Sequence, residues 1–207
     1  MNPFFFELIP PVPDPSKFEE ILFVDRDGVV IVEKNYIKDP RELEFIPGSI
    51  DALRSALKAN CFVAVVSNQA GLAKGILTET QFKGVNSRFI ALLRQADALV
   101  HCAIYCPTHP DGVVPAFALD DGYRKPAPGM YELVKKRYRL PAKRPFMIGD
   151  KATDIEFGKN IAAVSILVQT GYGLSEQQGA MAAFPEVIIQ ANLQTSILWI
   201  LNQRVQP

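Results

Sequence analysis

The 207-residue sequence has no excess of charge of either sign, because 22 Lys and Arg residues are balanced by 22 Asp and Glu residues. A broad grip on DNA or RNA needs surplus cations that replace the counterions of the phosphate backbone, so we expect no nucleic-acid partner. The three cysteines are an odd number and form no paired framework of the kind that small secreted domains use. A reducing compartment, the cytoplasm, is therefore predicted.

Several other signals are missing. No long uninterrupted apolar run occurs, and no basic residue precedes the apolar patch near the start, so we expect neither a membrane span nor a signal peptide. The GxGxxG fingerprint and the GxxxxGK[ST] loop are absent, which disfavours nicotinamide and P-loop nucleotide chemistry. What remains is a composition of 48% hydrophobic and 21% charged residues, which is typical of a globular protein that buries a core.

Prolines are frequent in the first 20 residues, which we interpret as an irregular N-terminal arm (1–20) before one domain (21–207). Within the domain, short apolar runs alternate with longer amphipathic stretches. The runs predict strands at 21–24, 62–66, 100–105, 145–148 and 164–168. The amphipathic stretches predict helices at 49–60, 78–96, 129–139 and 153–160, followed by a candidate from 175 and a closing helix at 193–201.

This alternation predicts an α/β fold, in which a doubly wound, mostly parallel sheet lies between two layers of helices. The apolar closing helix is expected to pack on the sheet and not against a partner. Ligands of such sheets bind at the carboxyl ends of the strands. The polar residues that follow each strand are therefore the candidates for a functional site.

Polar side chains follow three of the predicted strands and precede one helix. They are Asp25 and Asp27, Ser67 and Asn68, Arg124 and Lys125, and Asp150, Lys151 and Asp154. Two carboxylates at i and i+2 are costly to crowd together unless a cation neutralises them. Carboxylate oxygens without nearby histidine or cysteine suit Mg²⁺. We predict a Mg²⁺ site with Asp25 and Asp150 as side-chain ligands and the backbone carbonyl of Asp27 as a third.

The same residue types fit phosphoryl transfer. An aspartate carboxylate can attack phosphorus, which makes Asp25 the candidate nucleophile, and Asp27 can serve as acid and base for the leaving alkoxide and the water. Ser67 and Lys125 can position and neutralise the phosphoryl oxygens. Each segment alone has a structural explanation, such as a turn or the first turn of a helix. Their joint placement at strand ends favours a function.

The four segments resemble the haloacid dehalogenase (HAD) superfamily of phosphohydrolases. Longer runs, over about residues 21–173, resemble the D-glycero-D-manno-heptose 1,7-bisphosphate phosphatases and the related histidinol-phosphate phosphatases. These runs are Asp25-Arg26-Asp27-Gly28, Phe45-Ile46-Pro47-Gly48, Ser67-Asn68-Gln69-Ala70-Gly71-Leu72-Ala73-Lys74-Gly75, Cys106-Pro107, Arg124-Lys125-Pro126-Ala127-Pro128-Gly129-Met130 and Gly149-Asp150-Lys151.

The resemblance implies a HAD-like Rossmannoid fold without a large cap domain, and a Mg²⁺-dependent phosphomonoesterase that acts through an aspartyl-phosphate. It implies Asp25 as nucleophile, Asp27 as acid and base, and Asp150 as magnesium ligand. Ser67 and Lys125 become phosphate binders, and Asp154 supports Lys125 or the metal. Arg124 is a further substrate-binding candidate, Asn68 a weaker one, and Lys151 a weaker or supporting residue.

One departure concerns zinc, which that family usually holds through Cys-x-His and Cys-x-Cys. This sequence has Thr108 at the position of the ligand histidine, with His109 beside it, and Asp121-Gly122-Tyr123 without cysteine before Arg124. One thiolate and one imidazole do not make a closed four-ligand site, so the sequence argues against zinc. The loop 107–123 is too short for a cap domain, and we expect an open active site.

The favoured function is D-glycero-D-manno-heptose 1,7-bisphosphate 7-phosphatase, with a small phosphorylated metabolite as partner and a monomer as the favoured state. Histidinol-phosphate phosphatase and another sugar-phosphate phosphatase are the enzyme alternatives. A non-catalytic phospho-ligand binding protein does not need the acid and base Asp27. A glycosidase that uses Asp25 and Asp27 leaves Ser67 and Lys125 without a role. His101, Cys61 and Cys102 are expected to be structural.

Overall fold

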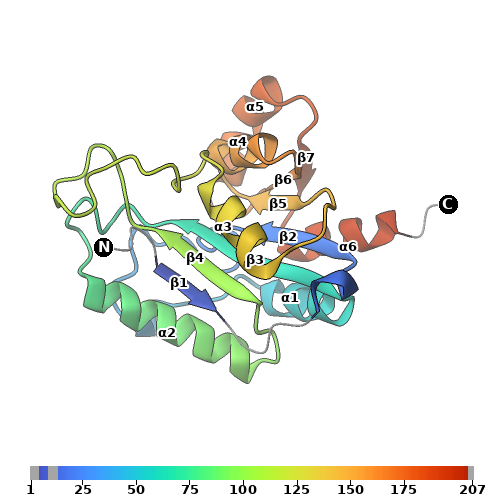
Figure 1. The fold of residues 1–207 in the computed structure, drawn as a ribbon, viewed down its shortest axis with the longest axis horizontal. Helices are drawn as coiled ribbons and strands as arrows, with labels where there is room; N and C mark the ends of the chain where they lie inside the picture. The colour runs from blue at the N-terminus through green and yellow to red at the C-terminus, as the bar shows by residue number, and fades with distance from the viewer. Residues whose placement is uncertain (1–4, 9–13, 205–207) are drawn as a thin grey trace.

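A single seven-stranded sheet organises the protein, in a computed structural model that describes residues 14–204 in full and residues 5–8 by their backbone. The strand order is β1-β4-β3-β2-β5-β6-β7 (Figure 1). The strands are β1 (Phe5–Leu8), β2 (Glu20–Val24), β3 (Cys61–Asn68), β4 (Cys102–Cys106), β5 (Phe146–Gly149), β6 (Val164–Val168) and β7 (Ile188–Gln190). Strand β1 pairs antiparallel with β4, and the other neighbours pair in parallel.

Helices connect the parallel strands, because two parallel neighbours cannot be joined by a tight turn and need a crossover connection. They are α1 (Ser49–Lys58), α2 (Glu79–Gln95), α3 (Gly129–Tyr138), α4 (Ala152–Asn160), α5 (Gly173–Ala183) and α6 (Leu193–Gln203), with short 3-10 turns η1 (Pro15–Lys17) and η2 (Pro40–Glu42). The start of α2 shows why these stretches are helical. Thr78 caps the helix, because its side chain accepts from the Gln81 N–H while the Gln81 side chain accepts from the Thr78 N–H.

The two faces of the sheet have separate cores, because neighbouring side chains of a strand point to opposite sides. In β2, Leu22 and Val24 pack in the core that includes α1, α2 and α6. Phe23, between them, packs in the core that includes α3 and α4. All three side chains are completely buried, so the central strands are apolar on both faces.

The chain changes direction across the sheet at β2. From β2 it proceeds through β3 to β4 on one side, and then returns to β5 on the other side of β2. A crevice forms at such a switch point, outside the carboxyl ends of the strands, because the crossovers on its two sides run in opposite directions. Residues that directly follow β2, β3 and β5 therefore meet at one place.

The predicted fold class is confirmed, and each of the five expected strands is present with ends shifted by at most two residues. The edge strands β1 and β7 were not expected. Strand β1 lies within the segment interpreted as an arm (1–20), where the frequent prolines gave no sign of a strand. Residues 1–4 and 9–13 of that segment lie outside the described residues. Among residues 5–8 and 14–204, no helix is both long and apolar enough to cross a bilayer.

Candidate active site

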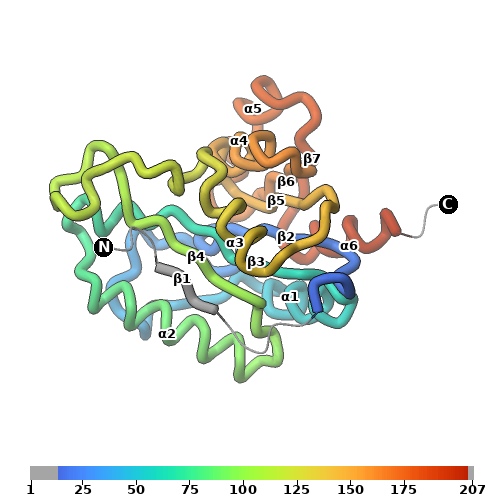
Figure 2. The backbone as a smooth tube through the Cα atoms, in the orientation of Figure 1, coloured from blue at the N-terminus to red at the C-terminus, as the bar shows by residue number. Residues whose placement is uncertain are grey.

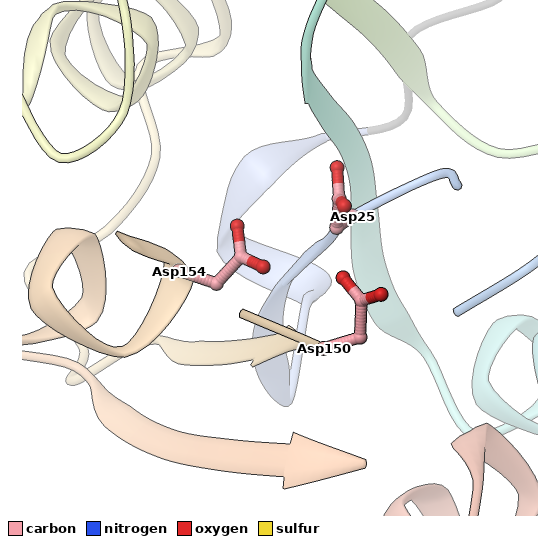
Figure 3. Close-up of side chains that lie close together, drawn as sticks. All are labelled: Asp25, Asp150 and Asp154. Atoms are coloured by element: carbon pink, nitrogen blue, oxygen red, sulfur yellow. The ribbon is translucent and has the colours of Figure 1, made fainter. Parts of the chain in front are cut away.

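Three aspartates meet where the carboxyl ends of β2 and β5 lie side by side (Figure 3). Asp25 follows β2, Asp150 follows β5, and Asp154 lies in the first turn of α4. One carboxylate oxygen from each residue lies within 4.8 Å of the others. Relative exposure is 5% for Asp25, 0% for Asp150 and 1% for Asp154, so the cluster is shielded from water.

Two glycines make room for Asp150. Gly28 and Gly171 both have positive φ, at 81° and 58°, and a Cβ on either one would overlap the Asp150 carboxylate. One oxygen, Oδ2, accepts a hydrogen bond from the Tyr172 N–H at 2.9 Å. The other, Oδ1, is buried and has no hydrogen-bond partner among the described residues. A buried carboxylate oxygen without a hydrogen-bond partner lowers the stability of the fold, so this atom is a candidate for binding a ligand.

Lys125 is the buried cation that faces this acidic cluster. Its Nζ donates to Asp25 Oδ1 at 2.9 Å and to the Val66 carbonyl at 2.9 Å, and it lies 2.6 Å from Asp154 Oδ1. These three contacts match the three donors of an ammonium group. Lys125 therefore holds Asp25 and Asp154 in place, and an incoming phosphoryl oxygen has to share one of its donors.

Burial controls the protonation of these groups. Desolvation raises the pKa of Asp25, which Lys125 opposes. Desolvation likewise raises the pKa of Asp150, and the nearby Asp25 and Asp154 charges raise it further. For Lys125, burial alone would lower the pKa, but the charges of Asp154 and Asp25 outweigh it and raise the pKa. Three acids against one lysine leave excess negative charge that a cation can neutralise.

Asp27 is held from two sides. The Arg26 guanidinium donates to both carboxylate oxygens, at 3.1 Å to Oδ1 and 2.9 Å to Oδ2. Gln69 Nε2 donates to Asp27 Oδ2 at 2.8 Å and also to Ser67 Oγ at 2.9 Å. Ser67 Oγ itself lies 3.4 Å from Asp27 Oδ2. The ends of β2 and β3 are thus joined through side chains.

Asn68, a weaker substrate-binding candidate, borders the pocket and also binds the backbone of Lys125. Its Nδ2 donates to the Lys125 carbonyl and its Oδ1 accepts from the Lys125 N–H, both at 2.9 Å. The amide therefore binds the backbone of a residue 57 positions away in the chain. Asn68 still borders the pocket, but its polar atoms hold Lys125.

The remaining predicted residues, Arg124 and Lys151, lie outside the buried aspartate cluster. Arg124 is partly buried, and its guanidinium donates to the Thr108 carbonyl at 3.4 Å. Lys151 Nζ lies 3.5 Å from Glu33 Oε2 and 4.4 Å from the centre of the Tyr172 ring. Both cations border the same pocket, so they can meet anionic parts of a ligand.

The pocket has a volume of about 290 Å³ and opens over the acidic cluster. All the predicted site residues except Asp150 line it, and Asp150 lies beneath, against Gly28. Glu33, Asn35, Tyr36 and Lys74 form further parts of its wall. A wall so rich in charged and amide groups suits a polar, anionic ligand.

The loop between β4 and α3 has its own hydrogen-bonded centre, and Figure 2 shows its irregular course. Cys106 Sγ lies 3.0 Å from Thr108 Oγ1, which donates to Asp121 Oδ1 at 3.1 Å. Asp121 Oδ1 also accepts from the Tyr123 N–H at 3.0 Å. The positions compared with zinc ligands in the sequence thus contact one another through hydrogen bonds.

Comparison with known proteins agrees with this geometry. Residues 122–194 match the family model described as HAD-hydrolase-like. A D-glycero-beta-D-manno-heptose-1,7-bisphosphate 7-phosphatase of Escherichia coli K12 is 35% identical over 75% of this chain and 82% of its own length. The D-glycero-alpha-D-manno-heptose-1,7-bisphosphate 7-phosphatase of Photorhabdus laumondii is 32% identical over 76% of this chain and 86% of its own. The chain belongs to the HAD phosphatase family.

Solved structures of other phosphatases resemble this HAD phosphatase in fold. The D,D-heptose 1,7-bisphosphate phosphatase of B. bronchiseptica, complexed with magnesium and phosphate, has a TM-score of 0.76 and 26% identity, covering 89% of this chain and 99% of its own. A HAD-like phosphatase from Mesorhizobium loti has a TM-score of 0.73 and 33% identity, covering 87% and 92%. The chain is accordingly a phosphoric monoester hydrolase.

The acidic cluster of this HAD phosphatase fits Mg²⁺. The unpartnered Asp150 Oδ1 and the nearby Asp25 carboxylate are hard oxygen donors, which Mg²⁺ prefers. Asp154 is less available, because Lys125 contacts its Oδ1 and the Lys151 N–H donates to its Oδ2. The side chain of Asp27 lies outside the cluster, so only its carbonyl stays a candidate ligand.

Besides the outer wall of the pocket, sequence reasoning missed two side chains that contact the predicted residues, Arg26 and Gln69. Both lie within the sequence motifs, Arg26 directly before Asp27 and Gln69 two residues after Ser67. Arg26 is 3% exposed and Gln69 is 6% exposed, although long polar side chains are mostly exposed. No spacing rule shows which of them turns inward, because the contact between Gln69 and Asp27 joins two separate strands.

Proposed function

We propose that this phosphatase uses Mg²⁺ to remove the 7-phosphate of D-glycero-D-manno-heptose 1,7-bisphosphate. The observation that carries the proposal is the buried cluster of Asp25, Asp150 and Lys125 beneath a polar pocket. Support for the substrate comes from the names of relatives that are 32% and 35% identical. Support for the metal comes from the related structure complexed with magnesium and phosphate.

The first half of the reaction transfers the phosphoryl group to the protein. A carboxylate oxygen of Asp25 attacks phosphorus, and an Asp25–phosphorus bond forms as the bond from phosphorus to the sugar oxygen breaks. The electron pair of the broken bond stays on the sugar oxygen, which takes a proton from Asp27. Lys125 holds Asp25 in position through its 2.9 Å hydrogen bond.

The second half releases phosphate. Asp27, now ionised, takes a proton from a water molecule that attacks the aspartyl-phosphate, and Asp25 is regenerated as the leaving carboxylate. Ser67 donates its hydroxyl to a phosphoryl oxygen in both halves. Asp25, Asp150 and the Asp27 carbonyl would hold Mg²⁺, which would supply positive charge to offset the negative charge of the phosphoryl oxygens.

The outer pocket matches a substrate with several hydroxyls and a second anionic group. Glu33 and Asn35 offer oxygen acceptors for hydroxyls, whereas Lys74 and Arg124 offer positive charge away from the acidic cluster. We keep the cytoplasmic location and the monomeric state as predictions.

The experiment is a phosphate-release screen of purified protein on phosphorylated metabolites, with Mg²⁺ or with EDTA. The panel includes heptose 1,7-bisphosphate and histidinol phosphate. We expect Mg²⁺-dependent release, with kcat/KM for heptose bisphosphate at least tenfold above that for histidinol phosphate. A higher value for histidinol phosphate or for another sugar phosphate contradicts the substrate, and no release from any compound contradicts the phosphatase function.

A further inference from the structure

The amide of Gln69 connects two residues that the proposed reaction uses. Gln69 follows the last residue of β3, and its backbone N–H donates to the Cys106 carbonyl at 2.7 Å, which anchors the turn to the end of β4. Its side chain is 6% exposed and lies in the pocket wall. Backbone and side chain are both held, so the amide points in one direction.

The orientation of this amide follows from its neighbours. Nε2 lies 2.8 Å from Asp27 Oδ2 and 2.9 Å from Ser67 Oγ, so its two N–H groups have one acceptor each. The reversed orientation would place the amide oxygen against a carboxylate oxygen, which is repulsive. Ser67 Oγ accepts from Gln69 and donates to Asp27 Oδ2 at 3.4 Å, a long bond that its hydroxyl can exchange for a phosphoryl oxygen.

The consequence for Asp27 concerns which oxygen can carry a proton. Oδ2 accepts from Gln69 at 2.8 Å and from Arg26 Nη2 at 2.9 Å and Nε at 3.2 Å. Among the described residues, Oδ1 accepts a single hydrogen bond, from Arg26 Nη2 at 3.1 Å. An oxygen surrounded by N–H donors is a poor place for a proton, whereas Oδ1 can hold one and pass it on.

We propose that Gln69 is a positioning residue that reserves Asp27 Oδ2 as an acceptor and thereby presents Asp27 Oδ1 as the oxygen that protonates the leaving group. This inference rests on the proposed role of Asp27 as the acid. Without the Gln69 amide, Oδ2 loses its shortest hydrogen bond, Arg26 holds the Asp27 carboxyl from one side, and the two oxygens become less different as sites for the proton. Gln69 also donates to Ser67, but Ser67 would bind phosphoryl oxygens that all substrates share, so the loss of proton transfer is the part that depends on the leaving group.

The dependence on the leaving group provides the test. An alkyl phosphate leaves as a strongly basic alkoxide and needs the proton, whereas p-nitrophenyl phosphate leaves as a weakly basic phenolate and needs it far less. The kcat/KM value reports the steps up to departure of the alcohol, so it isolates this half of the reaction. The variant is Gln69→Met, which keeps the length of the side chain and removes the amide.

For Gln69→Met we expect kcat/KM to fall about tenfold more on the best alkyl phosphate of the substrate panel than on p-nitrophenyl phosphate. In an Asp27→Asn background, Gln69→Met should cause no further leaving-group effect. Gln178→Met, the same change at an exposed residue of α5, serves as the control and should match the wild type. Thermal unfolding of each variant identifies any loss of folded protein.

Equal losses on both substrates, or no loss on the alkyl phosphate, would overturn the proposal. So would a leaving-group effect of Gln69→Met that persists at full size without Asp27. The proposed function fails separately, because it fails when the wild-type protein releases no phosphate from any compound.

Discussion

Replacing Asp150 by asparagine tests the central electrostatic argument. Asp150 is completely buried, its Oδ1 has no hydrogen-bond partner among the described residues, and burial beside Asp25 and Asp154 raises its pKa. Asparagine has nearly the same shape, and its oxygen can still accept from the Tyr172 N–H, a bond of 2.9 Å in the wild type. The substitution therefore removes a charge and leaves the packing in place.

The Asp150→Asn substitution should change folding stability in opposite directions with and without metal. A carboxyl group with a raised pKa in the folded state lowers stability as pH rises from its unfolded value of 3.8 through the folded value, because the folded protein then holds a poorly solvated charge. Without Mg²⁺ at neutral pH, we therefore expect the Asp150→Asn variant to be at least as stable as the wild type. With Mg²⁺ the ionised carboxylate becomes an advantage.

The magnitude follows from mass action. A ligand at a hundredfold excess over its Kd stabilises the folded state by about 2.7 kcal/mol. For a chain of this size, each kcal/mol shifts Tm by about 2–4 °C, so saturating Mg²⁺ should raise the wild-type Tm by about 5–10 °C. The Asp150→Asn protein should shift by less than about 2 °C, because it lacks a charged ligand.

The assay is thermal unfolding at pH 7.5 across a Mg²⁺ titration, with EDTA as the starting point. Asp97→Asn, the same substitution at an exposed aspartate, is the matched control and should respond as the wild type does. An Asp150→Asn protein that keeps the full Mg²⁺ shift would show that Asp150 does not bind the metal. A wild-type protein whose Tm does not change with Mg²⁺ would contradict the proposal of a metal site.

Three further changes test other parts of the structure. Asp25→Asn should abolish turnover, by about 10⁴-fold or more, while the protein stays folded by circular dichroism; wild-type rates would exclude Asp25 as the nucleophile. Asn68→Ala should lower kcat about tenfold through loss of Lys125 positioning, and the double variant with Lys125→Ala should be no slower than Lys125→Ala alone; additive losses in kcat would contradict this. Burial lowers the pKa of His101 from 6.5 to about 4, so stability that the neutral ring provides above pH 6.5 should be lost as pH falls towards 4, by up to about 3 kcal/mol. Equilibrium unfolding in urea at several pH values should show that the unfolding free energy falls less over that pH range for His101→Asn, which keeps an acceptor for the Val63 N–H. The same dependence of the unfolding free energy on pH in both proteins would refute this prediction.

The predictable part of the fold is the part with a strong local pattern. Completely buried residues such as Leu22 and Val65 come in runs that predict central strands, since a strand buried on both faces has no polar positions. Strand β7 has only three residues, none completely buried, and its sequence carries a weaker signal. Strand β1 depends on pairing with β4, almost 100 residues later, and no local pattern shows that pairing.

The site, too, has a part that the sequence shows and a part that it does not. Asp25 and Asp27 are two residues apart, directly after an apolar run, so their relation is visible in the sequence. The substrate-binding role that the resemblance implies for Asn68 stays a prediction, since Asn68 borders the pocket. In the structure it also hydrogen-bonds to the Lys125 backbone at 2.9 Å. A side chain with several possible partners cannot be assigned from its type alone.

By itself, the sequence determined the alternation of strands and helices and the chemical groups at the strand ends, because both depend on residues close together in the chain. Only the tertiary structure decided which groups face each other. Lys125 meets Asp25 from 100 residues away, Gln69 reaches Asp27 across two strands, and Asp150 lies against Gly28. These contacts arise because strand order and packing, not sequence distance, determine which side chains share a buried site where charge is strongly felt.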